Sequence, residues 1–212
     1  MFNTKPYLDK IRPYLGSLVI IVSLGGLWYP ILGYFMLVVM GTLFITSIFR
    51  GRWFCGNLCP RGSYFDYGII KISKKRKIPK ILSSMWLRIP VFTAMITFMM
   101  YRISVTFAAQ NTFDLIGTIF VSVCLMTTII GTILGGHFNT RSWCNFCPMG
   151  TMQRIIGGNK YQLQMDHDTC VDCKLCEKVC PMQLKVRDIG NNPDCIKCGR
   201  CVDKCPKDSL SF

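Results

Sequence analysis

Eight cysteines near the end of the chain carry the clearest chemical pattern. Residues 170–181 read CVDCKLCEKVCP and residues 195–206 read CIKCGRCVDKCP, so both stretches have the spacing C-x2-C-x2-C-x3-C-P. In this pattern, three closely spaced thiolates bind one [4Fe–4S] cluster and the fourth cysteine binds the other cluster. Zinc is a poor alternative, because zinc sites use paired rather than triplet spacing. The two predicted ligand sets are Cys170, Cys173, Cys176 with Cys205, and Cys195, Cys198, Cys201 with Cys180.

Two further cysteine pairs lie in similar surroundings. Residues 51–63 read GRWFCGNLCPRGS and residues 140–151 read TRSWCNFCPMGT, with pair spacings of C-x3-C and C-x2-C. Neither pair alone completes a metal site. We therefore predict that the four thiolates share one Fe–S cluster, and we favour [4Fe–4S] over [2Fe–2S]. The predicted ligands are Cys55, Cys59, Cys144 and Cys147.

Other interpretations of these two pairs stay open. Four thiolates also suit a structural zinc ion, and each pair could instead serve another cluster or another subunit. A disulfide is disfavoured in a reducing compartment. Proline after the second cysteine, then glycine, suits a loop that becomes a helix N-terminus, whose N–H groups point at an anion. With Trp53 matched to Trp143 and Gly62 to Gly150, the predicted cofactor-contacting residues are Trp53, Trp143, Gly62, Gly150 and His137.

Four apolar segments must position these cysteines. They cover residues 15–29, 31–49, 86–101 and 115–134. A helix needs about 20 apolar residues to cross a bilayer, and the chain is 50% hydrophobic and only 17% charged. We predict four transmembrane helices, with Pro90 and a snorkelling Arg88 at the interface. A soluble helical bundle is disfavoured, because four such uncharged runs are rare in soluble domains.

The position of the two Cys-Pro motifs predicts an internal repeat. Each motif follows a two-helix hairpin, so residues 1–158 divide into parallel repeats, 1–80 and 81–158, related by an axis along the membrane normal. Residues 159–212 form a compact domain in which YQLQMD and SLSF pair as short strands. The predicted fold class is membrane α-helical, with a C-terminal α+β double [4Fe–4S] ferredoxin-like domain.

Lysine and arginine are concentrated at one end of the predicted helices. The chain has 25 of them and a formal net charge of +14, but the two loops at the opposite end hold only Arg102. By the positive-inside rule, both termini and the ferredoxin domain face the cytoplasm from the inner membrane. Nucleic acid is then a poor partner. The run KKRK at 74–77 favours contact with anionic lipid, with docking of an acidic electron carrier as the alternative.

The remaining chemically notable residues suggest no catalytic site. Cys124, left over from the thirteen cysteines, is predicted to be a small packing residue. The only histidines are His137 and His167, which argues against a bis-His haem between membrane helices. Asp114 is predicted to cap the fourth helix. No P-loop, dinucleotide fingerprint or hydrolytic triad is evident.

The order of these motifs resembles a known family over essentially the whole chain. Helices with two Cys-Pro motifs, followed by a double ferredoxin pattern, resemble the membrane-bound ferredoxin-type quinol dehydrogenases of periplasmic nitrate reductase systems (NapH-type). They are also similar to the C-terminal part of the nitrous oxide reductase regulator and to cytochrome oxidase accessory ferredoxins. The second motif departs from this family, in which C-x3-C spacing is expected in both motifs. We also expect no large extracytoplasmic domain, which is a second departure.

The resemblance implies electron transfer between the quinone pool, iron–sulfur clusters and a partner redox protein. We predict a membrane-bound electron-transfer subunit of an oxidoreductase complex, quinol dehydrogenase-like, that passes single electrons between a cytoplasmic partner and a membrane quinone or a membrane partner's cofactor. Expected partners are other redox subunits and soluble ferredoxin or flavodoxin. Two alternatives are a relay to an extracytoplasmic flavin or haem partner, and an electron-supplying maturation factor for another metalloenzyme.

Overall fold

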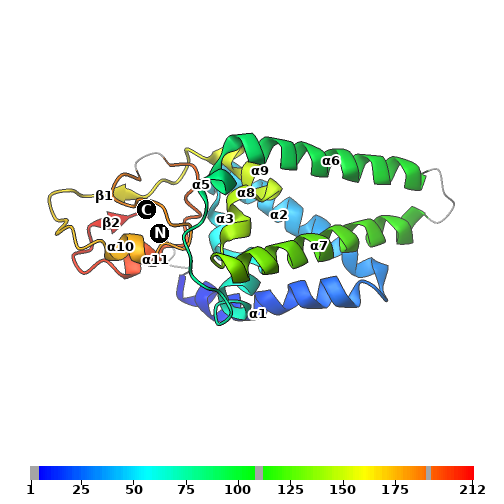
Figure 1. Cartoon of the computed structure of the whole chain (residues 1–212), viewed down its shortest axis with the longest axis horizontal. Helices are drawn as coiled ribbons and strands as arrows, with labels where there is room; N and C mark the ends of the chain where they lie inside the picture. Colours follow the sequence, from blue (N-terminus) through cyan, green and yellow to red (C-terminus); the bar gives the residue numbers. More distant parts are fainter. Residues whose placement is uncertain (1–4, 108–111, 190–191) are drawn as a thin grey trace.

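Long helices lie side by side and a small C-terminal domain caps one end of them (Figure 1). This computed structural model describes residues 5–107, 112–189 and 192–212. Residues 1–4 of the predicted first repeat and residues 108–111 of a predicted outer loop lie outside the described residues. The elements of the helical part are α1 (Lys5–Ile20), η1 (Ile21–Gly25), η2 (Pro30–Tyr34), α2 (Phe35–Arg50), α3 (Trp53–Asn57), α4 (Pro60–Ser63), η3 (Tyr64–Gly68), α5 (Lys80–Ser83), α6 (Met85–Phe107), α7 (Thr112–His137), α8 (Ser142–Phe146) and α9 (Pro148–Gly157). The C-terminal domain contains β1 (Gln164–Met165), α10 (Leu175–Lys178), α11 (Arg200–Asp203) and β2 (Leu210–Ser211).

Three helices of the described chain are long and apolar enough to cross a membrane. They are Pro30–Arg50, Met85–Phe107 and Phe113–His137, of 21, 23 and 25 residues. The segment 15–29 is not among them, because its helix, α1, carries charged residues through its first turns. α1 still lies along the bundle (Figure 1), where Gly16 packs against the backbone of Tyr64.

Backbone contact holds the two halves of the bundle together. A Cβ atom added to Gly33 of η2 would lie 2.3 Å from the carbonyl oxygen of Gly117 on α7. A Cβ added to Gly117 would lie equally close, at 2.3 Å, to the carbonyl oxygen of Pro30. Glycine allows helices in a membrane to approach this closely. The first hairpin is thereby fixed against α7.

The two Cys-Pro motifs form matching helix–turn–helix returns. Cys59 is the N-cap of α4 and Cys147 the N-cap of α9, and in both helices proline occupies the first turn. The N-cap dihedral angles agree as well, with φ −64° and ψ 115° at Cys59 and φ −53° and ψ 127° at Cys147. The predicted helix start after each Cys-Pro pair is therefore confirmed.

The C-terminal domain closes on itself through the predicted strand pair. β1 and β2 run antiparallel, with Gln164 opposite Ser211 and Met165 opposite Leu210. The residue before α10, Lys174, and the residue before α11, Gly199, both have left-handed backbones, with φ of 56° and 74°. The two cysteine triplets thus turn into their short helices in the same way.

An apolar core joins this domain to the returns. Met182 and Ile196 of the domain pack with Phe65, Trp143 and Phe146 of the helical part. Burial of such side chains is the main favourable contribution to holding two parts of a chain together. The ferredoxin-like end is therefore docked on the returns.

Two carboxylates, buried Asp66 and half-buried Asp194, reinforce the docking. Asp66 of η3 accepts two hydrogen bonds from Arg141, at 2.9 and 2.7 Å, and also pairs with Arg12 of α1 at 3.7 Å and with Arg200 of α11. Burial opposes ionisation of Asp66, but the arginine charges outweigh burial and lower the pKa of its carboxyl. One side chain thus ties together α1, the second return and the C-terminal domain.

Asp194 of the C-terminal domain has a similar role. It pairs with Arg52 at 3.0 Å, with Arg88 at 2.5 Å and with Arg154 at 2.5 Å. The prediction that Arg88 snorkels to the membrane interface is wrong, because its side chain is fully buried. Its Nη1 donates to the carboxylate of Asp194, 106 residues further along the chain.

We expect Asp66→Asn to destabilise the protein strongly. Asparagine keeps the shape of the side chain but leaves the buried Arg141 without its counter-charge, and breaking a buried pair in this way costs about 3–5 kcal/mol. The thermal unfolding midpoint in detergent should fall by at least about 6 °C. Asp188→Asn, at an exposed carboxylate, should leave it nearly unchanged. Equal midpoints for the two variants would contradict this role of Asp66.

Candidate iron–sulfur centres

The structure groups the predicted ligands into three sets. The edge set is Cys55, Cys59, Cys144 and Cys147, the proximal set is Cys180, Cys195, Cys198 and Cys201, and the distal set is Cys170, Cys173, Cys176 and Cys205. All four members of each set line one cavity, of about 90 Å³ for the edge set and about 20 Å³ each for the proximal and distal sets. All thirteen cysteines are free thiols.

The donor sets suit iron–sulfur clusters. Across residues 5–107, 112–189 and 192–212, no three His, Cys, Asp or Glu side chains are close enough together to ligate one metal ion. A four-iron cluster needs a wider ring of thiolates around a hollow, because irons and sulfides occupy the centre. Each set has four thiolates around such a hollow, and four thiolates are the ligands of a [4Fe–4S] cluster. The residues present therefore fit this group.

The edge set is built symmetrically from the two returns. Cys55 lies in α3 and Cys144 in α8, and both are only 8% exposed. Cys59 and Cys147 follow as the N-caps described above, where the Gly62 N–H donates to the Cys59 sulfur at 3.4 Å. Each return supplies one deeply buried thiol and one thiol at a helix start. A single return would leave half of the ring missing.

Two arginines cross between the returns. The Arg52 Nη2 donates to the carbonyl oxygen of Cys144 at 2.7 Å, and the Arg141 Nη1 donates to the carbonyl oxygen of Cys55 at 2.9 Å. Both arginines are 1% exposed. Each return therefore fixes the cysteine of the other. The sequence signal for these contacts is an arginine three residues before the first cysteine of each pair.

The predicted glycines make room for these arginines. A Cβ added to Gly62 would lie 2.5 Å from the Arg141 Nη1, and a Cβ added to Gly150 would lie 2.8 Å from the Arg52 Nη2. Both glycines are buried. The structure thus places Gly62 and Gly150 against the groups that position the cysteines.

Burial sets the ionisation of three of the edge thiols. It raises the pKa of Cys55 and Cys144, and it raises the pKa of Cys59 to about 11, although Arg52 and Arg141 act in the opposite direction. Thiols in such surroundings are neutral at pH 7, so binding of iron to thiolates would release protons. The two buried guanidinium groups are placed to offset the negative charge that results.

The proximal set lies between the other two. Cys180 and Cys198 pack against the same apolar core as the edge cysteines, whereas Cys176 and Cys205 of the distal set share a second core with Cys195. Burial raises the pKa of Cys195 to about 11 and that of Cys201 to about 12. In the distal set, Cys173 is exposed. The order in space is therefore edge, proximal, distal.

The other predicted site residues have different surroundings. Trp143 is 5% exposed and lines the edge cavity, but Phe54, at 3% exposed, lines it in place of the predicted Trp53. The Arg50 guanidinium lies over the Trp53 ring instead, with its central carbon 5.2 Å from the centre of that ring. His137 is exposed and packs edge-on against Phe138. Phe54 directly precedes Cys55, just as Trp143 directly precedes Cys144. Matching positions by their distance from the first cysteine of each pair therefore predicts Phe54.

Cys124 packs in the interior as predicted, at 3% exposed, with its sulfur 3.5 Å from the Ser23 hydroxyl. It also lines the edge cavity. Arg61 reaches into the bundle beside it and donates to the Cys124 carbonyl oxygen at 3.3 Å and to Thr128 at 3.3 Å. A positive charge thus lies next to the edge set on the membrane side.

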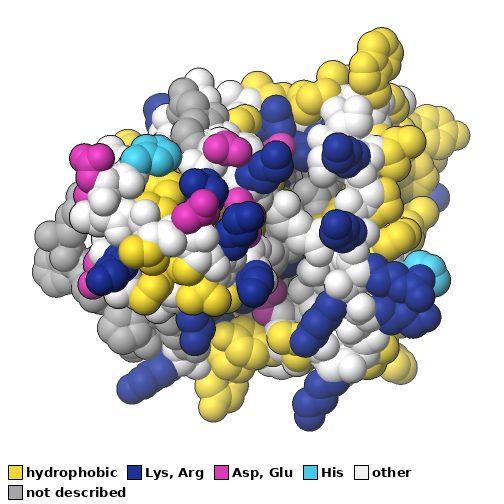
Figure 2. All heavy atoms as spheres, turned by 60° about the vertical axis from the view of Figure 1, so that its left-hand side comes forward, with side chains coloured by type: hydrophobic (Ala, Val, Ile, Leu, Met, Phe, Trp, Pro, Cys, Tyr) yellow, Lys and Arg dark blue, Asp and Glu magenta, His cyan; other side chains and the backbone are white. Residues whose placement is uncertain are grey.

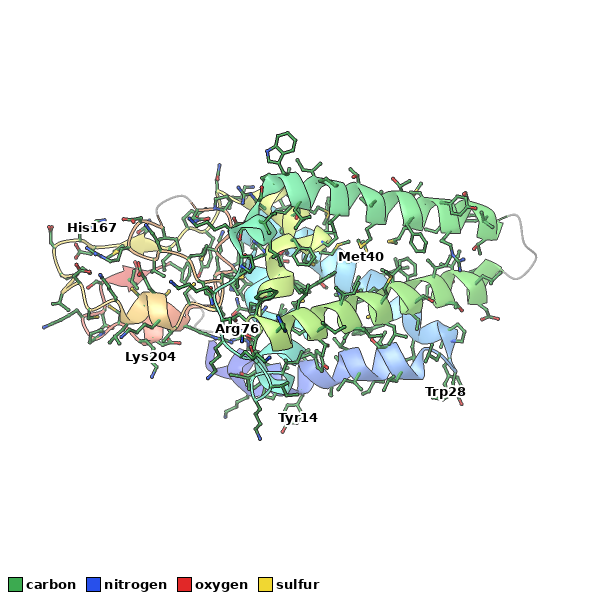
Figure 3. The ribbon with its side chains drawn as sticks, viewed as in Figure 1. Tyr14, Trp28, Met40, Arg76, His167 and Lys204 are labelled. Carbon is green, nitrogen blue, oxygen red and sulfur yellow. The ribbon has the colours of Figure 1, made fainter. Side chains whose placement is uncertain are left out.

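A second, methionine-rich cavity adjoins the edge set. It has a volume of about 40 Å³ and lies among α2, α6, α7 and α9, where Figure 3 labels Met40 between α6 and α7. Cys147 and Arg61 belong to its wall. Methionine side chains are flexible and fill irregular apolar space. The methionines that line it are Met36, Met40, Met95, Met99 and Met149.

Two protein families match the parts of the chain that hold the cysteine sets. The family described as "4Fe-4S binding domain" matches residues 32–79 and 118–162, one return in each segment. The family described as "4Fe-4S dicluster domain" matches residues 150–210, which contain the proximal and distal sets. No solved structure matches the chain significantly.

Similar proteins come from archaea and bacteria. Uncharacterized protein MJ0750 of Methanocaldococcus jannaschii is 28% identical over 79% of this chain and 74% of its own length. The putative electron transport protein YccM of Escherichia coli is 22% identical over 76% of this chain and 51% of its own length. The ferredoxin-type protein NapH of Escherichia coli is 33% identical over 33% of this chain and 29% of its own length. Although identity is low, these matches and the cysteine patterns support a relationship to the NapH-like, ferredoxin-type proteins with 4Fe–4S binding domains.

Proposed function

We propose that this protein is a membrane-bound electron-transfer subunit of an oxidoreductase complex. It would pass single electrons between a cytoplasmic redox partner and a membrane quinone or a membrane partner's cofactor. The observation that carries the proposal is the row of three four-cysteine sets that begins at the membrane helices and ends at an exposed surface. Bound to these sets, three [4Fe–4S] clusters would supply one-electron chemistry.

Direct backbone contact between the edge and proximal sets supports this path. Gly56 follows Cys55, Ile196 follows Cys195, and a Cβ added to Gly56 would lie 2.1 Å from the Ile196 carbonyl oxygen. The Asn57 amide also donates to the Lys197 carbonyl oxygen at 3.1 Å. The segments that carry the two sets are therefore packed directly against each other.

The methionine-rich cavity supports a quinone at the membrane end of the row. Ligand sites are mostly apolar with a few placed polar groups. Here the walls are chiefly thioether and hydrocarbon, Cys147 belongs to the edge set, and Arg61 supplies N–H donors of the kind that a quinone carbonyl accepts. We infer that a quinone ring approaches the edge set at this cavity and that the flexible methionine side chains move aside to admit it, because a volume of about 40 Å³ does not itself hold the ring.

Lysines at the other end of the row suit an acidic redox partner. Lys174 and Lys207 line the cavity of the distal set, while Asp172 there is paired with Arg187 at 2.6 Å. Opposite charges speed the encounter of two proteins. A soluble ferredoxin, a flavodoxin or another subunit of the complex would approach this surface.

We infer that four helices span the membrane as two parallel repeats, with α1 and η1 as the first span. Trp28, beyond η1, is 75% exposed and lies far from the C-terminal domain (Figure 3), whereas Trp86, 90% exposed, begins α6 near that domain. Exposed tryptophans at both ends suit the two interfaces of a bilayer. α1 and η1 thus run along most of the bundle (Figure 1).

We expect the end that carries the C-terminal domain to face the cytoplasm. Figure 2 shows Lys and Arg side chains gathered on this end, and the loop 71–80 contributes a series of exposed basic residues. Trypsin should therefore cut the loop in inverted membrane vesicles and spare it in right-side-out vesicles. Cleavage only in right-side-out vesicles would contradict this orientation.

The edge set should be needed for reduction by a quinol but not by dithionite. In vesicles treated with a menaquinol or ubiquinol analogue, the wild type should show reduced clusters by electron paramagnetic resonance. Cys55→Ser/Cys147→Ser should lose at least about nine tenths of this quinol-driven signal, because the edge set links the membrane to the other two sets. Dithionite should still reduce the proximal and distal clusters of that variant.

Cys124→Ser is the matched control, since Cys124 lines the edge cavity without belonging to a set. It should behave as the wild type. Equal quinol-driven reduction of the double variant would contradict a path through the edge set. A wild type that responds to dithionite and to neither quinol would instead favour an electron-supplying maturation factor.

A further inference from the structure

We propose that Gln153 is a positioning residue that raises the reduction potential of the cluster at the edge set. In the loaded protein, its side-chain amide would donate an N–H hydrogen bond to the sulfur of Cys55. The inference rests on the proposed cluster at the edge set. It assigns a role to a buried side chain that the ligand pattern leaves unexplained.

Gln153 lies on α9 and its side chain is fully buried. The Cys55 thiol donates to its Oε1 at 2.7 Å. Its Nε2 is also buried and has no hydrogen-bond partner in the described part of the chain. A buried amide with one unsatisfied end is costly for a protein to keep. An apolar side chain of similar size would fill this space without that cost.

Ligation of iron would reverse the direction of this hydrogen bond. A cysteine that binds iron has lost its proton, so its sulfur can only accept. The Oε1 would then face a negatively charged sulfur. Rotation of the amide about its last torsion, which is broad in glutamine, presents the Nε2 to Cys55 and gives the unpartnered N–H group an acceptor. The amide therefore fits the ligated state better than the free thiol.

The other thiols of the edge set have different neighbours. The Arg141 Nη1 lies 3.6 Å from the Cys144 sulfur, and the Gly62 N–H lies 3.4 Å from the Cys59 sulfur. In the first return, the residue six positions after the Cys-Pro cysteine is Phe65, where the second return has Gln153. The amide is thus an asymmetric addition to a nearly symmetric site.

Hydrogen bonds to cluster sulfurs change the reduction potential. A donor stabilises the more negative, reduced state more than the oxidised state, so its loss should lower the potential. Purely structural packing by Gln153 would have no such directional effect. The potential therefore distinguishes the two roles.

The test is a redox titration of the anaerobically purified full-length protein, followed by electron paramagnetic resonance, with iron and labile sulfide counted on each sample. In Gln153→Met, the ratio of reduced to oxidised edge cluster at a fixed potential should fall about three- to tenfold. A tenfold fall corresponds to a reduction potential lowered by about 59 mV for one electron. Gln153→Glu, which keeps the shape but replaces the amide with a carboxylate, should lower the potential further. The proximal and distal potentials should not move.

Gln162→Met is the matched control, because Gln162 is half-buried and its amide donates to the Gly158 carbonyl oxygen. It should leave all potentials unchanged. Full iron content with an unmoved edge potential in both Gln153 variants would overturn the inference and leave the proposed function intact. An equal fall in Gln162→Met would overturn it too. A wild type with about 8 irons and no third signal would overturn both proposals, because no cluster would occupy the edge set.

Discussion

The pairing of two carboxylates, buried Asp66 and half-buried Asp194, with six arginines is the interaction on which the rest of the structure depends. Asp66 gathers Arg12, Arg141 and Arg200, and Asp194 gathers Arg52, Arg88 and Arg154. Charges removed from water are tolerated only when they are paired and hydrogen-bonded. Because the partners come from α1, α6, both returns and the C-terminal domain, none of these parts satisfies its charges alone. The returns can form a four-thiol ring only when the whole chain is assembled.

The same arginines connect assembly to the chemistry of the site. Arg52 and Arg141 each use one part of the guanidinium group for a carboxylate and another for the carbonyl oxygen of a cysteine in the opposite return. They fix the geometry of the edge cysteines and place positive charge beside them. The surrounding apolar core excludes water, which strengthens these electrostatic effects. Arg52 and Arg141, within the same apolar core, thus set both the position and the charge environment of the edge cysteines.

Local spacing predicted the parts of the structure that local chemistry determines. The triplet spacing predicted which cysteines of the C-terminal domain share a cavity, and the Cys-Pro pairs predicted where α4 and α9 begin. Contacts between residues far apart in the chain were harder to predict from the sequence. The burial of Arg88 depends on Asp194, which lies far along the chain. The position of Arg88 near the start of an apolar segment predicted only that it lies at the interface. Matching the tryptophans by residue type, rather than by distance from the cysteine, led to Trp53 instead of Phe54.

The central claim is that the two returns together hold a third cluster. Its most direct test is the iron and labile sulfide content per chain of anaerobically purified protein, beside that of Cys55→Ser/Cys147→Ser. Three [4Fe–4S] clusters require about 12 irons and 12 sulfides in the wild type, and the variant should fall to about 8 of each. About 8 irons in both proteins would contradict the claim, and the edge cysteines would then not share a cluster.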